Sequence, residues 1–281
     1  MTFANAEQAA FWSQLAPTWL ELEDQLEQVS GPPGRLAMDL LGLAPGQRVV
    51  DLGCGSGGTT LELASRVGAE GGVLGVDIAD EMLERGRERA TQLGVTTVEF
   101  LNADVQVEDL GTARFDAAYS RFGVMFFDDP IAAFTNVRRA LRPEGLLSFV
   151  CWQSVFDNEW MLIPGVAVAS VTGSLPPMPG PGEPGPFSLA DPDRVRSVLG
   201  AAGFAAVDVV PHADELVIAE VDIPEIALSR ARVGAAREAL RDADDQTRQL
   251  AVAAIEDAFR ARVSDGQVRT SRGVLVVVAR T

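Results

Sequence analysis

The sequence contains no lysine, so its 23 basic residues are all arginines, and 40 acidic residues and one histidine accompany them. The resulting formal net charge of −17 repels phosphate backbones and anionic lipid head groups. We therefore expect no nucleic acid among the partners of this chain.

Cysteine and histidine are too scarce for a disulfide framework or a zinc cluster. The two cysteines are Cys54 and Cys151, and the single histidine is His212. A structural zinc ion needs about four such ligands, and small disulfide-bonded folds need several bridges. The sequence therefore predicts no metal site, and its cysteine usage is compatible with a reducing cytoplasm.

Long apolar runs are also missing. Residues 1–5 contain neither a basic region nor an apolar run, and no segment reaches the roughly 18 apolar residues that span a bilayer. We expect a soluble protein without a membrane span. Of the 281 residues, 47% are hydrophobic, which is enough for a large core. We expect one compact unit, present as a monomer or a homodimer.

What the sequence does contain is an alternation of strand and helix patterns. Expected strands cover residues 49–52, 73–77, 98–101, 115–119 and 146–152, followed by 205–210 and 274–279. Between the first five lie expected helices at 59–67, 81–93 and 130–141. This order implies right-handed βαβ units. The predicted fold is α/β, with a Rossmann-like, doubly wound, seven-stranded and mainly parallel sheet and helical lid insertions.

Four segments follow from this reading. Residues 1–46 form a helical cap, which Ser30–Gly34 interrupts, and residues 47–152 form the nucleotide-binding core. Residues 153–190 form a lid loop, because proline and glycine cluster between Leu175 and Pro186. Residues 191–281 complete the core and carry a helical insertion at about 211–268, with two helices expected within 223–263.

Helix starts are marked by acidic residues. Asp80 is expected to cap the helix at 81–93, and Asp129 with Pro130 the helix at 130–141. Asp191 with Pro192 opens a further helix that Gly203 ends.

The segment 51–58 carries the chemistry and reads Asp-Leu-Gly-Cys-Gly-Ser-Gly-Gly between a strand and a helix. Glycines there allow a sharp turn and the close approach of a ligand. Gly53, Gly55 and Gly58 also fit the dinucleotide pattern G-x-G-x-x-G, and Asp77 stands where an acid would bind a ribose. A match of this kind alone does not decide between a dinucleotide and a cofactor without phosphate.

Three features favour a cofactor without phosphate. Asp51 beside the glycines would repel a pyrophosphate but attract an ammonium or a sulfonium. Thr59 and Thr60 open the following helix, where hydroxyl and N–H groups can hold a carboxylate. Asp104 follows the third strand, where it can accept a hydrogen bond from an adenine amino group beside Val105.

With these motifs in place, the chain resembles class I S-adenosylmethionine-dependent methyltransferases. Val50–Gly57 is similar to their first motif, Gly75–Ile78 to their second-strand motif, and Asn102–Asp104 to their adenine-binding motif. Leu141–Gly145 is similar to the turn before their fifth strand, except that Glu144 stands where glycine is usual. The quinone-type (UbiE-like) and related small-molecule enzymes are the most similar group. The resemblance covers about residues 40–155 and implies an antiparallel last strand.

The resemblance implies S-adenosyl-L-methionine as cofactor, S-adenosyl-L-homocysteine as product and a set of binding residues. The loop around the methionine part is Asp51, Gly53, Cys54, Gly55 and Gly57, with Cys54 as a small packed residue and Thr59 and Thr60 behind it. Asp77 would bind the ribose, Ile78 and Met82 would pack on the nucleoside, and Asp104 and Val105 would hold adenine. Ser120 and Arg121 would lie next to the methyl group, and Trp12 and Trp19 either cover the cofactor or belong to the core.

The sequence indicates less clearly which residues bind the methyl acceptor. Phe122, Met125 and Phe126 follow the fourth strand, where ligands of doubly wound sheets bind, and Asn158 and Trp160 follow the fifth. Their apolar character predicts a hydrophobic or aromatic small molecule, methylated on oxygen or carbon, which includes quinone-like compounds and specialised metabolites. No catalytic base is identified, since His212 reads as a solvated loop residue. Arsenite methylation is disfavoured by the scarcity of cysteine.

Two alternatives stay open. An NAD(P)-dependent oxidoreductase could use the same glycine loop, although a Tyr-x-x-x-Lys proton relay is impossible in a chain without lysine. A non-catalytic protein could bind the same cofactor but would lack an open acceptor pocket.

Overall fold

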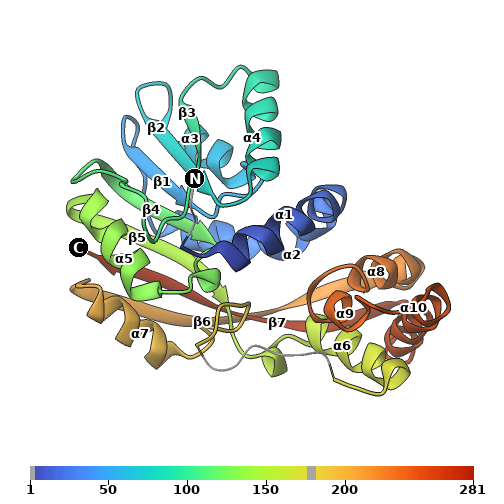
Figure 1. The fold of residues 1–281 in the computed structure, drawn as a ribbon. Helices are drawn as coiled ribbons and strands as arrows, with labels where there is room; N and C mark the ends of the chain where they lie inside the picture. Colours follow the sequence, from blue (N-terminus) through green and yellow to red (C-terminus); the bar gives the residue numbers. More distant parts are fainter. Residues whose placement is uncertain (1–3, 176–181) are drawn as a thin grey trace. The chain divides into compact units, whose positions relative to one another are not determined.

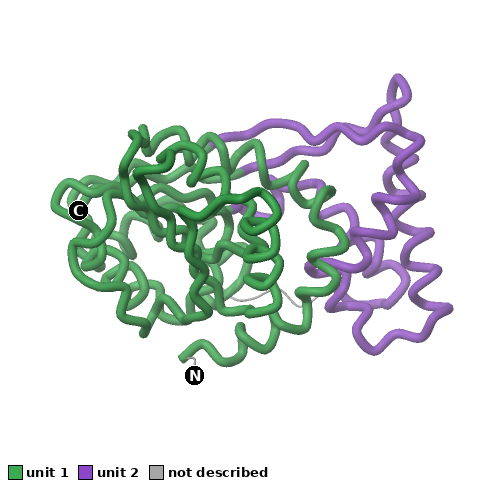
Figure 2. The backbone as a smooth tube through the Cα atoms, turned by 90° about the horizontal axis from the view of Figure 1, so that it is seen from above, with its two compact units in different colours: residues 1–151, 182–211, 274–281 green, residues 152–181, 212–273 purple. Residues whose placement is uncertain are grey.

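The computed structural model describes residues 4–175 and 182–281, so part of the Pro/Gly cluster between Leu175 and Pro186 lies outside the described residues (Figure 1). The described chain divides into two compact units (Figure 2). Unit 1 comprises residues 1–151, 182–211 and 274–281, and unit 2 comprises residues 152–181 and 212–273. The expectation of one compact unit therefore differs from the structure, since local patterns do not show how chain segments group in space.

A seven-stranded sheet has the strand order β3-β2-β1-β4-β5-β7-β6. Its strands are β1 (Arg48–Leu52), β2 (Gly72–Asp77), β3 (Val98–Asn102), β4 (Phe115–Arg121), β5 (Leu141–Trp152), β6 (Ala206–Ala219) and β7 (Gln267–Arg280). Strands β1 to β5 pair in parallel. Strand β7 runs antiparallel to them, because Gln153 N donates to Gly273 O near one end of the pair and Thr281 N to Gly145 O near the other. The predicted fold class is confirmed.

Ten α-helices lie in the described residues. They are α1 (Ala6–Glu21), α2 (Glu23–Asp39), α3 (Gly58–Val67), α4 (Asp80–Leu93), α5 (Pro130–Ala140), α6 (Glu159–Thr172), α7 (Pro192–Ala201), α8 (Ile223–Arg230), α9 (Gly234–Ala239) and α10 (Asp245–Arg260). None of these helices combines the length and apolarity needed to cross a bilayer.

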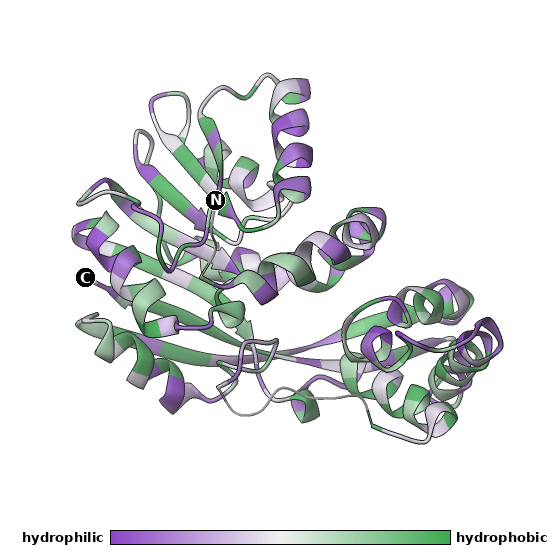
Figure 3. Cartoon of the chain, in the orientation of Figure 1, coloured by the Kyte–Doolittle hydropathy of each residue, from purple (hydrophilic) through white to green (hydrophobic). Residues whose placement is uncertain are grey.

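Unit 1 is organised around the buried strands. The inner strands β1 and β4 are mostly buried along their length, and Figure 3 shows hydrophobic (green) stretches along the strands of the sheet. Helix α3 packs on β1 and β2, α4 packs on β2 and β3, and α1 packs on α4. Two helix starts form as predicted, since the Asp129 carboxylate accepts from Ala132 N and the Asp191 carboxylate from Asp193 N.

Unit 2 has its own apolar core. Helix α10 packs against α6 and α8, and α9 packs against α6. The core residues come from these helices and from the unit 2 part of β7, and include Ile163, Ile223, Ile255, Phe259 and Val268. Sequence analysis expected two helices in residues 223–263 and a loop over residues 153–190. The structure instead has three helices, α8 to α10, within residues 223–263, and the helix α6 within residues 153–190.

The predicted interruption at Ser30–Gly34 is wrong, because α2 continues through Pro32 and Pro33. Tertiary packing supports this stretch. The Tyr119 hydroxyl donates to the Gly34 carbonyl at 2.8 Å, and a Cβ on Gly34 would come within 2.5 Å of Arg121 Cδ. A glycine here lets the helix approach β4 closely, and that contact overrides the low helix propensity of the segment.

The predicted cap at Asp80 is also wrong. Helix α4 starts at Asp80 itself, Ala79 is the N-cap residue, and no side chain caps the helix. The Ala79 amide instead donates to Asp77 Oδ1 at 2.9 Å, so the acid at the end of β2 organises this turn.

Candidate functional site

The glycine loop connects β1 to α3 in unit 1. Gly53, Gly55 and Gly57 have φ angles of 66°, 55° and 77°, a region that favours glycine. A Cβ on Gly53 would lie 2.9 Å from Gly123 Cα, and one on Gly57 would lie 2.8 Å from the Phe100 ring. A Cβ on Gly55 would have no heavy atom within 4 Å among the described residues. Packing therefore explains two of the glycines, while Gly55 borders open space.

Asp51 is fully buried at the end of β1. The hydroxyls of Thr59 and Thr60 both donate to its Oδ2 at 2.7 Å. Its Oδ1 is buried and has no hydrogen-bond partner among the described residues. Burial raises the pKa of Asp51 to about 6, against the opposing effect of the two threonines. The carboxylate is thus held in place with one acceptor atom left over.

Asp77 links the second strand to the loop. Its Oδ2 accepts from Gly55 N at 2.8 Å and its Oδ1 from Ala79 N at 2.9 Å. Burial raises its pKa, although these amide donors act in the opposite direction. The two predicted acids Asp51 and Asp77 therefore meet at the same loop, as expected for adjacent parallel strands.

Asp104 and Val105 lie just after β3 and are buried. The carboxylate of Asp104 accepts from Gln106 N at 3.0 Å and from the backbone amide of Asn5 at 2.9 Å. The Asn5 side chain donates to the Phe126 carbonyl at 2.7 Å. The sequence did not single out Asn5 or Gln106, because a contact between residues 5 and 104 has no local signal.

Trp12 and Trp19 of α1 pack beside the turn between β2 and α4. Met82 is buried together with Ala79, and Trp12 and Trp19 pack partly buried against them. The two indoles meet edge to face with ring centroids 5.2 Å apart, and Trp12 meets Phe126 in the same way at 4.9 Å. Helix α1 thus brings aromatic surface to two predicted site regions, and a cofactor-covering role stays a prediction, as it does for the half-buried Ile78.

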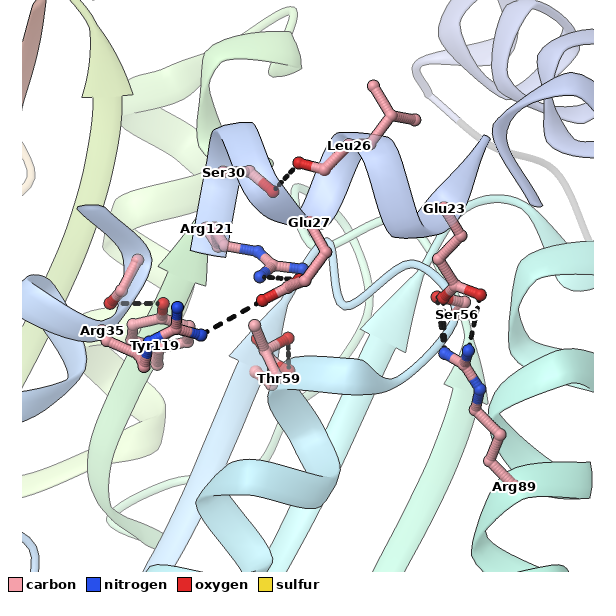
Figure 4. Close-up of polar contacts among 12 residues, drawn as sticks. Glu23, Leu26, Glu27, Ser30, Arg35, Ser56, Thr59, Arg89, Tyr119 and Arg121 are labelled. Atoms are coloured by element: carbon pink, nitrogen blue, oxygen red, sulfur yellow. Dashed lines mark hydrogen bonds and ion pairs between the residues drawn. The ribbon is translucent and has the colours of Figure 1, made fainter. Parts of the chain in front are cut away.

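Two acidic residues of α2 that sequence analysis missed reach this site (Figure 4). Glu23 accepts from the hydroxyl of Ser56 in the glycine loop and pairs with Arg89 of α4. Glu27 pairs with Arg121 at the end of β4, with Nη1 and Oε2 2.6 Å apart. The spacing of four places both acids on one helix face, which was the only available signal.

The end of β4 is fixed by backbone contacts. Ser120 donates to the Leu52 carbonyl at 2.7 Å, which ties β4 to β1. Phe122 has a φ of 59°, a left-handed conformation that is uncommon outside glycine and that occurs at functional turns. Met125 is buried, and its carbonyl accepts from Ser188 Oγ at 2.6 Å. These contacts hold the segment next to the glycine loop.

The predicted acceptor residues Asn158 and Trp160 belong to unit 2. The Asn158 amide donates to the carbonyls of Ser154 and Gly273, both at 3.0 Å. Its oxygen accepts from Trp160 Nε1 and Gly273 N, both at 3.1 Å. All polar atoms of Asn158 are used within unit 2, and contact with an acceptor stays a prediction for both residues.

The remaining chemistry-bearing residues have simple surroundings. Cys54 and Cys151 are buried free thiols, and burial raises the pKa of both. His212 is partly exposed, with Nε2 3.8 Å from Asp214 Oδ2. Within the described ranges, no group of three or more His, Cys, Asp or Glu residues could hold a metal ion.

Comparison with known proteins identifies residues 49–145 as a match to the family model of a methyltransferase domain. Nocamycin O-methyltransferase from Saccharothrix syringae is 30% identical over 65% of this chain and 62% of its own length. Aklanonic acid methyltransferase DauC from Streptomyces sp. (strain C5) is 31% identical over 42% of this chain and 54% of its own length. The chain spans about half the length of the curated relatives that it matches, with 54% for the DauC enzyme.

Among solved structures, the YcgJ protein of Bacillus subtilis superposes with a TM-score of 0.58 at 20% identity, over 89% of this chain and 97% of that one. This similarity shows the fold.

Proposed function

We propose that this chain, whose residues 49–145 are a methyltransferase domain, uses S-adenosyl-L-methionine to methylate a hydrophobic or aromatic small molecule on oxygen or carbon. We further propose that it works in the cytoplasm, as a monomer or a homodimer and without a nucleic-acid partner.

The observation that carries this proposal is the unpaired Oδ1 of Asp51. A buried acceptor without a donor is costly, and the open space at Gly55 borders the same loop. The ammonium of the methionine part supplies a charged donor that fits this acceptor. A dinucleotide pyrophosphate would instead bring negative charge toward Asp51, so the geometry disfavours the oxidoreductase alternative.

The other predicted residues fit the rest of the cofactor. Thr59 and Thr60 donate their hydroxyl hydrogens to Asp51, so the backbone N–H groups at the start of α3 are the donors for the methionine carboxylate. Asp77 has lone pairs left for the ribose hydroxyls. Asp104 already accepts from Asn5 N, Gln106 N and Gln106 Nε2, so an adenine amino group would bind there in place of one of these donors.

When bound, S-adenosyl-L-methionine supplies a methyl group on a sulfonium, which is an excellent leaving group. The protein's task is then to align the acceptor, exclude water and hold the cofactor. Tyr119 is not suited to remove a proton, because its buried hydroxyl donates to Gly34 and burial raises its pKa. An acceptor that is already nucleophilic, such as a phenolate or an enolate carbon, fits these surroundings best.

Two features support a small apolar acceptor. Residues 122–127 follow β4 with mostly apolar side chains beside the glycine loop. Two relatives are named for the methylation of aklanonic acid and nocamycin, both of them small molecules.

The test is transfer of a labelled methyl group from S-adenosyl-L-methionine to a panel of phenols, hydroquinones and β-dicarbonyl compounds. We expect time-dependent labelling of at least one compound, a mass increase of one methylene group, and loss of both in Asp77→Ala. Tight cofactor binding without transfer to any member of a broad panel would instead support the non-catalytic alternative.

A further inference from the structure

Unit 2 contains a buried arginine, Arg230, on the face of α8 that otherwise carries apolar residues. Ile223 and Ala227 of α8 and Ala231, the residue after the helix, belong to the unit 2 core. Arg230 lies seven residues after Ile223 and three after Ala227, which is the same helix face. Its side chain follows that face inward, and only 6% of the residue is exposed.

The guanidinium of Arg230 has an aromatic neighbour but no counter-ion. Its Cζ lies 5.0 Å from the centroid of the Trp160 ring. Among the described residues, none forms an ion pair with it, and its buried Nε has no hydrogen-bond partner. Burial lowers the pKa of Arg230 to about 10, so the group is charged at neutral pH.

A second buried arginine in the same unit, Arg272, has the counter-ion that a buried guanidinium usually needs. Arg272 is 4% exposed and forms a two-pronged contact with the Asp214 carboxylate, in which Nε lies 2.7 Å from Oδ1. This arrangement satisfies the planar donor fork of an arginine. The guanidinium of Arg230 has the same planar set of N–H donors, but no carboxylate among the described residues accepts from them.

An unpaired buried charge is strongly unfavourable, and stacking on Trp160 compensates only in part. We propose that Arg230 is a recognition residue for a small-molecule carboxylate whose apolar body binds within unit 2. A monoanion balances the single positive charge, whereas a phosphate dianion would leave a net negative charge among apolar residues. The residues packed around α8 are buried and apolar, which favours an aromatic or aliphatic body over a polar one. This site goes beyond the proposed methyl transfer, and because Trp160 is also a predicted acceptor residue, its tests measure binding and not methyl transfer.

The first experiment measures binding to the full chain by calorimetry, with 1-naphthoate, its neutral amide 1-naphthamide, and 1-naphthyl phosphate as probes. We expect 1-naphthoate to bind at least tenfold tighter than the amide and tighter than the phosphate. Arg230→Met should remove the preference for the acid, and Arg262→Met, at an exposed arginine of the same unit, should keep it. Absence of saturable naphthoate binding, equal affinity for acid and amide, or preference for the phosphate would overturn the proposal.

The second experiment separates recognition from a structural role by thermal unfolding. Because Arg230→Met removes an unpaired buried charge, we expect its melting temperature to equal or exceed that of the wild type. Arg272→Met leaves Asp214 without its partner and should unfold at a lower temperature. A loss of stability in Arg230→Met as large as that in Arg272→Met would show that Arg230 is already paired, and would contradict the proposal.

Discussion

The hydroxyl of Thr60 donates a hydrogen bond of 2.7 Å to Oδ2 of Asp51, and both residues are fully buried. Thr59 adds a second bond to the same oxygen. The first turn of α3 therefore holds the carboxylate at the end of β1 in one orientation and leaves Oδ1 as the available acceptor. The predictions for the cofactor site follow from this arrangement.

Replacing Thr60 with valine should destabilise the fold. Valine has the same shape but no hydroxyl, so Asp51 loses a donor in a buried setting, at a cost of about 1–3 kcal/mol. Thr60→Ser keeps the hydroxyl and serves as the matched control. Denaturant unfolding of both variants checks this, and equal stabilities would show that the hydrogen bond contributes nothing measurable.

Cofactor affinity should fall as the pH falls through the pKa of Asp51, which burial raises to about 6. Above that pH the carboxylate is ionised and attracts the ammonium of the ligand, and below it the protonated form does not. We expect S-adenosyl-L-homocysteine to bind roughly tenfold more weakly at pH 5 than at pH 7. Burial also raises the pKa of Asp77, so the comparison needs a variant of Asp51.

Asp51→Asn provides that comparison. Asparagine can still accept from Thr59 and Thr60 but does not titrate, so its affinity should be lower than that of the wild type and less dependent on pH. A wild-type affinity that does not change between pH 5 and pH 7 would rule out ionised Asp51 as the ammonium partner.

Removing the carboxylate of Asp77 should weaken cofactor binding at least tenfold, or about 1.4 kcal/mol. The variant Asp77→Ala loses both the proposed ribose contact and the acceptor for Gly55 N. Asp80→Ala is the matched control, since Asp80 lies three residues further on and pairs with Arg87 at the surface. Unchanged affinity in folded Asp77→Ala, measured by calorimetry, would refute the proposed role.

Glu144→Gly should stabilise the protein. Glu144 has a φ of 65°, in the left-handed region, and occupies the turn where similar sequences carry glycine. Relief of that strain is worth about 1 kcal/mol, partly offset by the greater freedom of glycine in the unfolded chain.

Glu144→Ala separates this effect from loss of the exposed ion pair with Arg280. Alanine removes the charge but keeps the Cβ, so its melting temperature should not rise. If the glycine variant is no more stable than the alanine variant, the backbone conformation at Glu144 carries no cost.

The parallel part of the fold could be predicted because its signals are local. Alternating strand and helix patterns, the acids at strand ends and the caps at Asp129 and Asp191 all act within a few residues. The bend at Leu141–Gly145 is also present, since Phe115 pairs with Leu141 and Ala117 with Leu146, which leaves the intervening residues as a bulge.

Elements that depend on distant contacts were predicted poorly. Helix α2 passes through two prolines because it packs on Tyr119 and Arg121, which lie far away in the sequence. Strands β6 and β7 are 14 residues long each, well beyond the short apolar segments that marked them. Their extra residues alternate between exposed and more buried positions, a weaker signal than a continuous apolar run.

The candidate site shows the same division. Asp51 and Asp77, which the sequence singled out, both lie at the glycine loop, because neighbouring parallel strands end at the same edge. Three residues of the N-terminal segment were not predicted, because their partners lie far away in the sequence. Glu23 contacts Ser56 of that loop, Glu27 contacts Arg121, and Asn5 contacts Asp104. The cofactor-binding and acceptor-binding roles of individual residues remain predictions that the variants above test.

The most direct measurement is calorimetric titration of the purified protein with S-adenosyl-L-homocysteine and, separately, with NADH. We predict micromolar binding of S-adenosyl-L-homocysteine and no binding of NADH, because Asp51 attracts an ammonium and repels a pyrophosphate. Binding of NADH without binding of S-adenosyl-L-homocysteine would contradict the account and favour an oxidoreductase that uses the same glycine loop.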